Sequence, residues 1–276
     1  MSAPSEQPVD THAPESGHYT FGDSDLAVRR LRLLSAAFAG SSRELLREVG
    51  TAGAARPRVA LDLGCGPGYS TALLARELEP AATIGLDSSR RYIERAREYA
   101  LRGLEFVEHD LTRVPFPTPA ADFLYGRFIV THLRDGHALV DRWAEGAAPG
   151  ARLVLEEVAT LDADDEALRR YYGLVVALQA AHGQTTYVGG ALAERPASSP
   201  WIVERARRRR VALPAATAAE LHALNFATWR HEPFIEATVA ADELDRLGES
   251  LRALALGERT AAPVRWELAQ VVMRRR

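Results

Sequence analysis

Cysteine is almost absent from this chain, and lysine is absent altogether. Cys65 is the single cysteine in 276 residues, so the chain forms no internal disulfide and fits a reducing compartment such as the cytoplasm. All 34 basic residues are arginine, and the formal net charge is −3. This balance argues against a general binder of polyanions, so we expect no nucleic-acid partner.

Long apolar runs are lacking as well. No stretch reaches the roughly 18 apolar residues that a membrane span requires, and the polar, acidic start lacks the apolar segment of a secretory signal peptide. We therefore expect no membrane association and a cytoplasmic location. Hydrophobic residues make up 47% of the chain and charged residues 26%, as in ordinary globular domains. Residues 1–18 differ, because their Pro-, Ser- and Glu-rich composition predicts a disordered tail.

A regular alternation of short apolar runs and amphipathic segments occupies residues 57–158. The runs have the length and composition of buried parallel strands, and the segments between them have helical periodicity. Strands that alternate with helices imply a parallel sheet with right-handed crossovers. Strands are predicted at 58–63, 82–86, 104–108, 122–125 and 152–157, and helices at 70–79, 90–101 and 136–147.

The flanks of this core are less regular. Residues 19–56 predict a helical N-terminal cover in two pieces, and residues 159–276 predict pocket-forming helices followed by final strands of the same sheet. We therefore predict an α/β fold, a Rossmann-like doubly wound sheet that is mostly parallel with an antiparallel final strand, plus a helical insertion after strand five. In the C-terminal part, helices are predicted at 162–181, 189–195, 217–229 and 241–256, and strands at 201–213 and 264–273.

The segment VALDLGCGPG, residues 59–68, carries the strongest chemical signal. Asp62 precedes a glycine-rich turn formed by Gly64, Gly66 and Gly68. Such glycines let the backbone approach a ligand closely, and the following helix directs free N–H groups at it. A dinucleotide fingerprint would place its third glycine one position later. The nearby carboxylate would also repel a pyrophosphate, so a nicotinamide oxidoreductase is disfavoured and a cationic or amino-bearing ligand is favoured.

Two further acidic residues come at the ends of the next two predicted strands. Asp87 follows strand two and can accept hydrogen bonds from both hydroxyls of a ribose, and Asp110 follows strand three and can contact an adenine amino group. Ligands of open parallel sheets bind outside the carboxyl ends of the strands, so Asp62, Asp87 and Asp110 point to one crevice. The alternative is that Asp87 and Asp110 merely cap the following helices.

With these motifs, residues 57–158 resemble class I S-adenosylmethionine-dependent methyltransferases, and the core is similar to the ubiquinone/menaquinone methyltransferase type. VALDLGCGPG corresponds to the first motif of that family, TIGLDSS to the acidic second motif and FVEHDL to the third. The resemblance implies S-adenosylmethionine as cofactor and S-adenosylhomocysteine as product. The residues it implies at the cofactor are Tyr19, Asp62, Gly64, Cys65, Gly66, Gly68, Asp87, Ser88, Asp110, Leu111 and Arg127.

Methyl transfer from a sulfonium mainly requires alignment of the reactants and exclusion of water, although a phenol or amine acceptor can also need a general base. His132, just after strand four, is the first candidate base, and a structural role in a helix-start turn is its alternative. Glu156, at the end of strand five, is the second. Tyr171, Tyr172 and His182 are candidates for the acceptor pocket, with helix packing as the alternative.

Other chemistries receive less support from the sequence. No cluster of metal ligands is evident, and Asp162, Asp164 and Asp165 are predicted to cap a helix, so no metal is expected. The arginines at 205 and 207–210 alternate in a predicted strand and suit a solvated sheet edge. Cys65 is an unlikely nucleophile inside a cofactor loop.

The leading interpretation is a bacterial enzyme that methylates an O, N or C atom of a small molecule in specialised (antibiotic-type) metabolism. A first alternative keeps the cofactor but uses it for a non-methylating reaction, such as aziridine-type ring closure or elimination. A second alternative is a non-catalytic partner subunit. Both a homodimer and a heteromeric partner remain compatible with the sequence.

Overall fold

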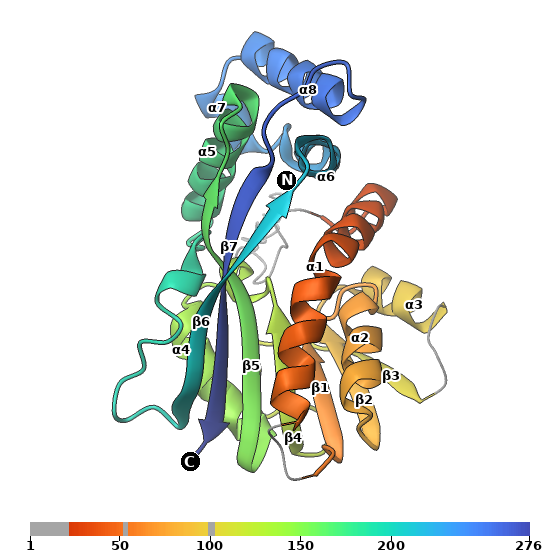
Figure 1. Cartoon of the computed structure of the whole chain (residues 1–276), viewed down its shortest axis with the longest axis vertical. Helices are drawn as coiled ribbons and strands as arrows, with labels where there is room; N and C mark the ends of the chain where they lie inside the picture. The colour runs from red at the N-terminus through yellow and green to blue at the C-terminus, as the bar shows by residue number, and fades with distance from the viewer. Residues whose placement is uncertain (1–21, 52–54, 99–102) are drawn as a thin grey trace, which may run out of the picture.

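The computed structural model describes residues 22–51, 55–98 and 103–276. The tail predicted at residues 1–18 and the candidate cofactor residue Tyr19 lie outside this part of the chain. Figure 1 shows a single mixed sheet with helices on both faces and a further group of helices beyond one end of its longest strands.

Seven strands form the sheet in the order β3-β2-β1-β4-β5-β7-β6. Strands β1 to β5 are mutually parallel, whereas β7 runs antiparallel to both of its neighbours, β5 and β6. The predicted fold class, mostly parallel with an antiparallel final strand, is confirmed. The strands are β1 (Val59–Leu63), β2 (Ala82–Asp87), β3 (Leu104–Glu108), β4 (Ala121–Arg127), β5 (Ala147–Asp162), β6 (Trp201–Leu213) and β7 (Val264–Arg275).

The interior strand β1 shows why the strands of the core appear in the sequence as apolar runs and not as alternating apolar and polar residues. Ala60 packs against Leu45 and Leu74 on one face of the sheet, and Leu61 packs into a cluster with Val140 on the other face. Both faces of the strand are therefore buried, as in other parallel sheets.

Helices cover both faces of the sheet and cap one end of it. None of the described helices is long and apolar enough to cross a membrane. The helices are α1 (Asp25–Thr51), α2 (Tyr69–Leu78), α3 (Arg90–Glu98), α4 (Gly136–Arg142), α5 (Glu166–Ala181), α6 (Ala215–Trp229), α7 (Pro233–Thr238) and α8 (Ala241–Ala255), and short 3₁₀ turns are η1 (Val130–His132), η2 (Trp143–Gly146) and η3 (Val188–Gly190).

Three long strands connect the core, residues 57–158, to a group of C-terminal helices that we call the cap. β5 has 16 residues, β6 has 13 and β7 has 12, compared with 5 in β1. They extend past the core, and α5, α6, α7 and α8 gather around their far end (Figure 1). Trp229 and Trp266 belong to the apolar cluster that joins this cap to the strands. The cap therefore stands above the same sheet edge where β1, β2 and β4 end.

Several local predictions were wrong. The N-terminal cover is one continuous helix, Asp25–Thr51, because its buried stripe continues through residues 38–49 without a break. Strand β5 continues to Asp162, so helix α5 begins only at Glu166, where the Asp165 side chain accepts from the backbone N–H of Leu168 at 3.1 Å. The helix predicted at 189–195 is only the short turn η3.

The arginine-rich strand β6 lies at the edge of the sheet, as expected. Successive arginines point to opposite faces: Arg207 donates to Glu48 of α1 at 2.9 Å, and Arg209, on the same face, donates to Glu44 of α1 at 2.7 Å. Arg210, on the other face, lies 3.5 Å from Glu267 of β7. Acidic partners from α1 and β7 therefore account for these arginines within the protein itself.

Candidate functional site

A cavity of about 950 Å³ opens at the carboxyl ends of β1, β2 and β4. We distinguish two parts of it. The loop side contains the glycine-rich turn together with the ends of β2 and β3, and the inner side lies under α1, α5 and α6. The loop side is lined by Gly64, Cys65, Gly66, Asp87, Ser88, Asp110 and Leu111, and the inner side by Arg30, Arg127, His132, Tyr171, Tyr172, His182, His222, Asn225 and Trp266.

The glycine-rich turn is held by the neighbouring strand and requires backbone conformations that favour glycine. Gly64 and Cys65 donate their N–H groups to the carbonyl of Leu86 at 2.8 and 3.0 Å. Gly64, Gly66 and Gly68 all have positive φ, at 73°, 52° and 86°. Gly64 and Gly66 line the cavity, whereas Gly68 packs beneath the ring of Phe106 and is absent from the lining. The turn thus presents backbone, rather than side chains, to a ligand.

Asp87 is a carboxylate that lines the loop side of the cavity and contacts the glycine-rich turn. One of its oxygens accepts from the backbone N–H of Gly66 at 2.8 Å, and the other accepts from that of Ser89 at 2.9 Å. A carboxylate has about four lone-pair positions, so both oxygens retain acceptor capacity for a diol. Burial is the main cause that raises the pKa of Asp87 to about 6. The hydroxyl of Ser89, and not Asp87, accepts from the backbone N–H of Tyr92 at 3.2 Å in the first turn of α3, so the helix-capping alternative is wrong for Asp87.

Asp62 takes a different position from the one that the sequence suggested. Its side chain is 1% exposed and does not line the cavity. It accepts from the hydroxyls of Ser70 and Thr71, at 2.7 and 2.6 Å, and burial raises its pKa. Asp62 thus ties β1 to the first turn of α2 and fixes the turn between them.

The end of β3 completes the loop side. Asp110 lines the cavity, and its Oδ1 accepts from the backbone N–H and the hydroxyl of Thr112, at 2.9 and 2.8 Å. The carbonyl of Leu111 accepts from the indole N–H of Trp143 at 3.0 Å. These bonds fix the direction of a loop that lines the cavity together with Ser88.

Cys65 lines the loop side, but its thiol is a poor nucleophile. The side chain is buried. Burial, followed by the charges of Asp87 and Asp62, raises the pKa of the thiol well above its usual value. The nucleophilic thiolate is therefore suppressed, in agreement with the structural role expected from the sequence.

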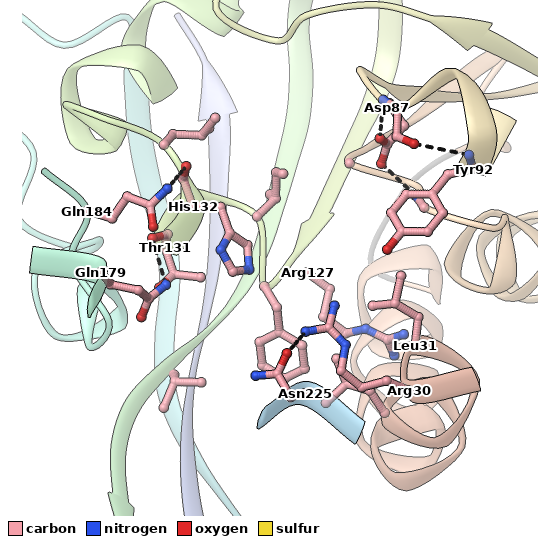
Figure 2. A pocket seen from close by; sticks show the side chains of 18 of the residues that line it. Arg30, Leu31, Asp87, Tyr92, Arg127, Thr131, His132, Gln179, Gln184 and Asn225 are labelled. Atoms are coloured by element: carbon pink, nitrogen blue, oxygen red, sulfur yellow. Dashed lines mark hydrogen bonds between the residues drawn. The ribbon is translucent and has the colours of Figure 1, made fainter. Parts of the chain in front are cut away.

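His132 and Arg127 both face the inner side of the cavity (Figure 2). His132 is half-buried in the 3₁₀ turn η1, and its loss of solvent, together with the nearby charge of Arg30, lowers its pKa to about 3. Its imidazole is neutral at pH 7 and is only a weak base. Arg127 donates to the hydroxyls of Ser42 and Ser35 of α1, each at 3.1 Å.

The second candidate base, Glu156, is not in the cavity lining. Its carboxylate accepts from the phenol of Tyr125 at 2.6 Å and from the amide of Gln270 at 2.7 Å, on the face of the sheet under α1. Its neighbour Glu157 points the other way and accepts from the backbone N–H groups of Ile129 and Val130, at 2.8 and 2.7 Å. Both glutamates therefore organise the sheet and the turn after β4 instead of reaching the cavity.

The three pocket residues proposed on α5 line the inner side, and a buried polar network connects two of them to α6. Tyr172 and His222 are joined by a hydrogen bond of 2.6 Å, and Tyr171 accepts from the amide of Asn225 at 2.6 Å. The ring of His222 stacks on that of Tyr171, with 4.4 Å between centroids. His182 lies nearer the surface, 3.4 Å from Glu232.

Several residues that line the inner side of the cavity could not be identified from the sequence. His222, Asn225 and Trp266 come from α6 and β7, far along the chain, and no local motif marks them. Arg30 did carry a signal, because it occupies the buried stripe of α1 together with Ala27 and Phe38. An arginine at such a position is unusual, since charged side chains are seldom fully buried. Within the described residues, no three potential ligands gather as a metal site.

Comparisons with known proteins agree with this geometry. Residues 60–150 match a family model described as a methyltransferase domain. A trans-aconitate 2-methyltransferase of Methylobacterium nodulans is 35% identical over 116 residues, which is 42% of this chain and 44% of that protein. The chain thus spans less than half the length of the curated relatives that it matches.

Two solved structures share the fold. One, from Anaeromyxobacter dehalogenans and named as a type II methyltransferase, has a TM-score of 0.55 at 20% identity over 84% of this chain and 95% of that one. The other is a coclaurine N-methyltransferase bound to N-methylheliamine and S-adenosylhomocysteine, with a TM-score of 0.52 at 15% identity over 86% and 72% of the two chains.

Proposed function

We propose that this chain methylates a small molecule, on the premise that residues 60–150 match a methyltransferase domain and that the core resembles the class I S-adenosylmethionine-dependent methyltransferases. The observation that carries this proposal is the continuity of one cavity, which joins the glycine turn and Asp87 to a buried, polar inner side. The inner side has the position and the enclosure that a small acceptor requires.

The loop side fits the cofactor of the family. Gly64 and Gly66 offer unobstructed backbone, and Asp87 keeps lone pairs for the two ribose hydroxyls. Asp110 and Leu111 would border the adenine, as the resemblance implies. S-adenosylmethionine supplies a methyl group activated on a sulfonium, so the chain itself need not form a covalent intermediate.

The contribution of this chain is alignment and exclusion of water. α1 closes the cavity from one side through Arg30, and α5 and α6 close it from the other through Tyr171, Tyr172 and His222. An acceptor held among these groups would lie next to the loop side, and this proximity is the main source of acceleration. We propose an acceptor of specialised metabolism and a cytoplasmic location, and trans-aconitate, named in the relatives, is the first acceptor to test.

Cofactor turnover tests the proposed function directly. The purified protein is incubated with S-adenosylmethionine and candidate acceptors, and S-adenosylhomocysteine and methylated product are quantified by mass spectrometry. Equal amounts of the two are expected. Acceptor conversion without S-adenosylhomocysteine would contradict methyl transfer and point to a ring closure or elimination. Failure to bind S-adenosylhomocysteine in calorimetry would contradict any catalytic use of this cofactor and would instead suit a non-catalytic subunit.

Cofactor affinity is expected to depend on pH through Asp87. The ionised carboxylate accepts hydrogen bonds from the ribose hydroxyls, and burial raises its pKa to about 6. The acceptor form is therefore present above pH 6 and is lost as the pH falls below it. The affinity for S-adenosylhomocysteine should fall about tenfold between pH 7 and pH 5. Calorimetry across this range measures it, and an Asp87→Asn variant should lose this dependence.

A further inference from the structure

We propose that the acceptor is a neutral carbonyl compound whose oxygen accepts hydrogen bonds from the rings of Tyr171, His222 and Trp266 on the inner side of the cavity. We call these three side chains the ring stack. The inference rests on the proposed function, because it assigns the chemical class of the molecule that receives the methyl group. It follows from the burial of the rings, from the hydrogen bonds that they already make and from the donors that remain.

The ring stack joins three elements that are distant in the chain. Tyr171 belongs to α5, His222 to α6 and Trp266 to β7. The ring of His222 stacks on that of Tyr171, and it lies at 16° to the ring of Trp266 with 6.3 Å between centroids. The three side chains are buried and line the inner side. Their polar atoms are the N–H and O–H groups at the edges of the rings.

The hydrogen bond to Tyr172 decides which nitrogen of His222 carries the proton. Burial, followed by the charge of Arg30, lowers the pKa of His222 to about 3, and burial raises the pKa of Tyr172, so both groups are neutral at pH 7. Among the described residues, the Tyr172 hydroxyl has one hydrogen-bond partner, the Nε2 atom of His222 at 2.6 Å. The phenol satisfies its proton by donating there, which leaves the imidazole proton on Nδ1. This Nδ1 atom is buried and has no partner in the described part of the chain.

Trp266 and Tyr171 add further donors to the ring stack. The Nε1 atom of Trp266 is buried without a hydrogen-bond partner among the described residues, and an indole N–H can only donate. The Tyr171 hydroxyl accepts from the amide of Asn225 at 2.6 Å, and no hydrogen bond within the described residues uses its own proton. Buried polar groups of native proteins are rarely left unpaired. The ring stack therefore requires a ligand that supplies acceptor atoms.

A neutral carbonyl oxygen meets this requirement at a low cost of desolvation. It has two lone pairs and no proton, whereas an amine or a phenol brings a donor that this part of the wall does not need. A carboxylate also accepts, but removing a charge from water costs far more than removing a carbonyl. Phe128, Val175 and Leu221 line the same side and can contact the apolar body of the molecule. The ring stack thus favours a neutral carbonyl compound over an amine, a phenol or a carboxylic acid.

Matched pairs of ketones and hydrocarbons test the proposal on protein saturated with S-adenosylhomocysteine. The probes are acetophenone with ethylbenzene and 1-indanone with indane, and NMR titration gives their dissociation constants. Each ketone should bind about tenfold more tightly than its hydrocarbon, the effect of one or two net hydrogen bonds. A wall without free donors reverses this order, because the hydrocarbon gains more by leaving water. That reversed order, or the absence of ketone binding, would overturn the proposal.

Benzoate separates recognition of a carbonyl from recognition of a charge. If benzoate binds more tightly than acetophenone, the guanidinium groups of Arg30 and Arg127 select the ligand instead of the ring stack, and the proposal is wrong. Binding of S-adenosylhomocysteine is measured first, and the probe pairs are measured with and without it. Failure of the proposed function is therefore recognised separately from failure of this inference.

Trp266→Phe assigns the preference to the ring stack. The variant keeps an aromatic ring but removes the Nε1–H group, so the preference for the ketone should fall roughly 3- to 10-fold while hydrocarbon binding stays within about twofold. Trp201→Phe is the matched control, because the buried indole N–H of Trp201 donates to the carbonyl of Val140 at 2.8 Å and the residue does not line the cavity. It should leave the preference unchanged. Equal preferences in the two variants would contradict the role of Trp266.

The tautomer of His222 provides a test that needs no variant of Trp266. A long-range ¹H–¹⁵N NMR spectrum distinguishes a proton on Nδ1 from one on Nε2, and the resonance is assigned by its absence from the His222→Gln spectrum. The wild-type protein should carry the proton on Nδ1. A proton on Nε2 would remove this donor from the ring stack and overturn the proposal, even if Trp266→Phe failed to fold.

Discussion

Replacement of Asp87 by asparagine is expected to weaken the binding of S-adenosylhomocysteine at least about 100-fold. The carboxylate would lose two hydrogen bonds to the ribose hydroxyls, and each hydrogen bond to a charged group contributes about 1.5–3 kcal/mol. The asparagine amide also places an N–H₂ group against one of two backbone donors, those of Gly66 and Ser89, which lie at 2.8 and 2.9 Å. Calorimetry with S-adenosylhomocysteine measures the loss.

Asp242→Asn is the matched control for this variant. Asp242 is an exposed residue of α8 that pairs with Arg246, and its replacement should leave cofactor affinity within about twofold. Equal affinities of the Asp87→Asn and Asp242→Asn proteins would remove Asp87 from the cofactor site. Thermal unfolding of both variants separates lost binding from lost structure.

Gly64→Ala is expected to lower the free energy of unfolding by about 2–4 kcal/mol and to abolish cofactor binding. Gly64 has φ of 73°, a conformation that alanine adopts only with strain. A Cβ atom at this position would also lie 2.5 Å from the Cδ1 atom of Ile129, so the turn or the segment after β4 must move. Chemical denaturation and calorimetry measure the two effects.

Gly190→Ala makes the same chemical change where nothing opposes it. A Cβ atom at Gly190 meets no other heavy atom within 4 Å, so its effect on stability should remain within about 0.5 kcal/mol. The double variant Gly64→Ala/Ile129→Ala removes the steric contact but keeps the backbone strain, and it should recover only part of the lost stability. If Gly64→Ala is as stable as Gly190→Ala, the turn is not constrained as the structure indicates.

Much of the core could be predicted because its signals are local. The alternation of apolar runs and helices in residues 57–158 was sufficient to predict a parallel sheet. The turn after β1 needs positive φ at Gly64, Gly66 and Gly68, and these three glycines lie within five consecutive residues. The position of Asp87 at the end of β2 follows from the same alternation. These features depend on residues that are neighbours in the chain, so they can be predicted from the sequence alone.

The direction of side chains at the strand ends was less predictable. Asp62 and Glu156 both lie near the carboxyl ends of predicted strands, and both were expected to serve the cavity. Asp62 instead turns toward the hydroxyls of α2, and Glu156 turns toward Tyr125 on the opposite face from Glu157. Alternation along a strand sends neighbours to opposite faces, and only the packing of the helices decides which face borders the cavity.

The sequence by itself determined the fold class, the glycine turn and Asp87, since each is encoded by residues close together in the chain. The tertiary structure alone decided the inner side of the cavity. Arg30 and Asn225 are 195 positions apart, and they meet because β5, β6 and β7 are long enough to carry α6 back over α1. Contacts between such distant residues depend on how the helices pack on the sheet, and no local pattern in the chain records that packing.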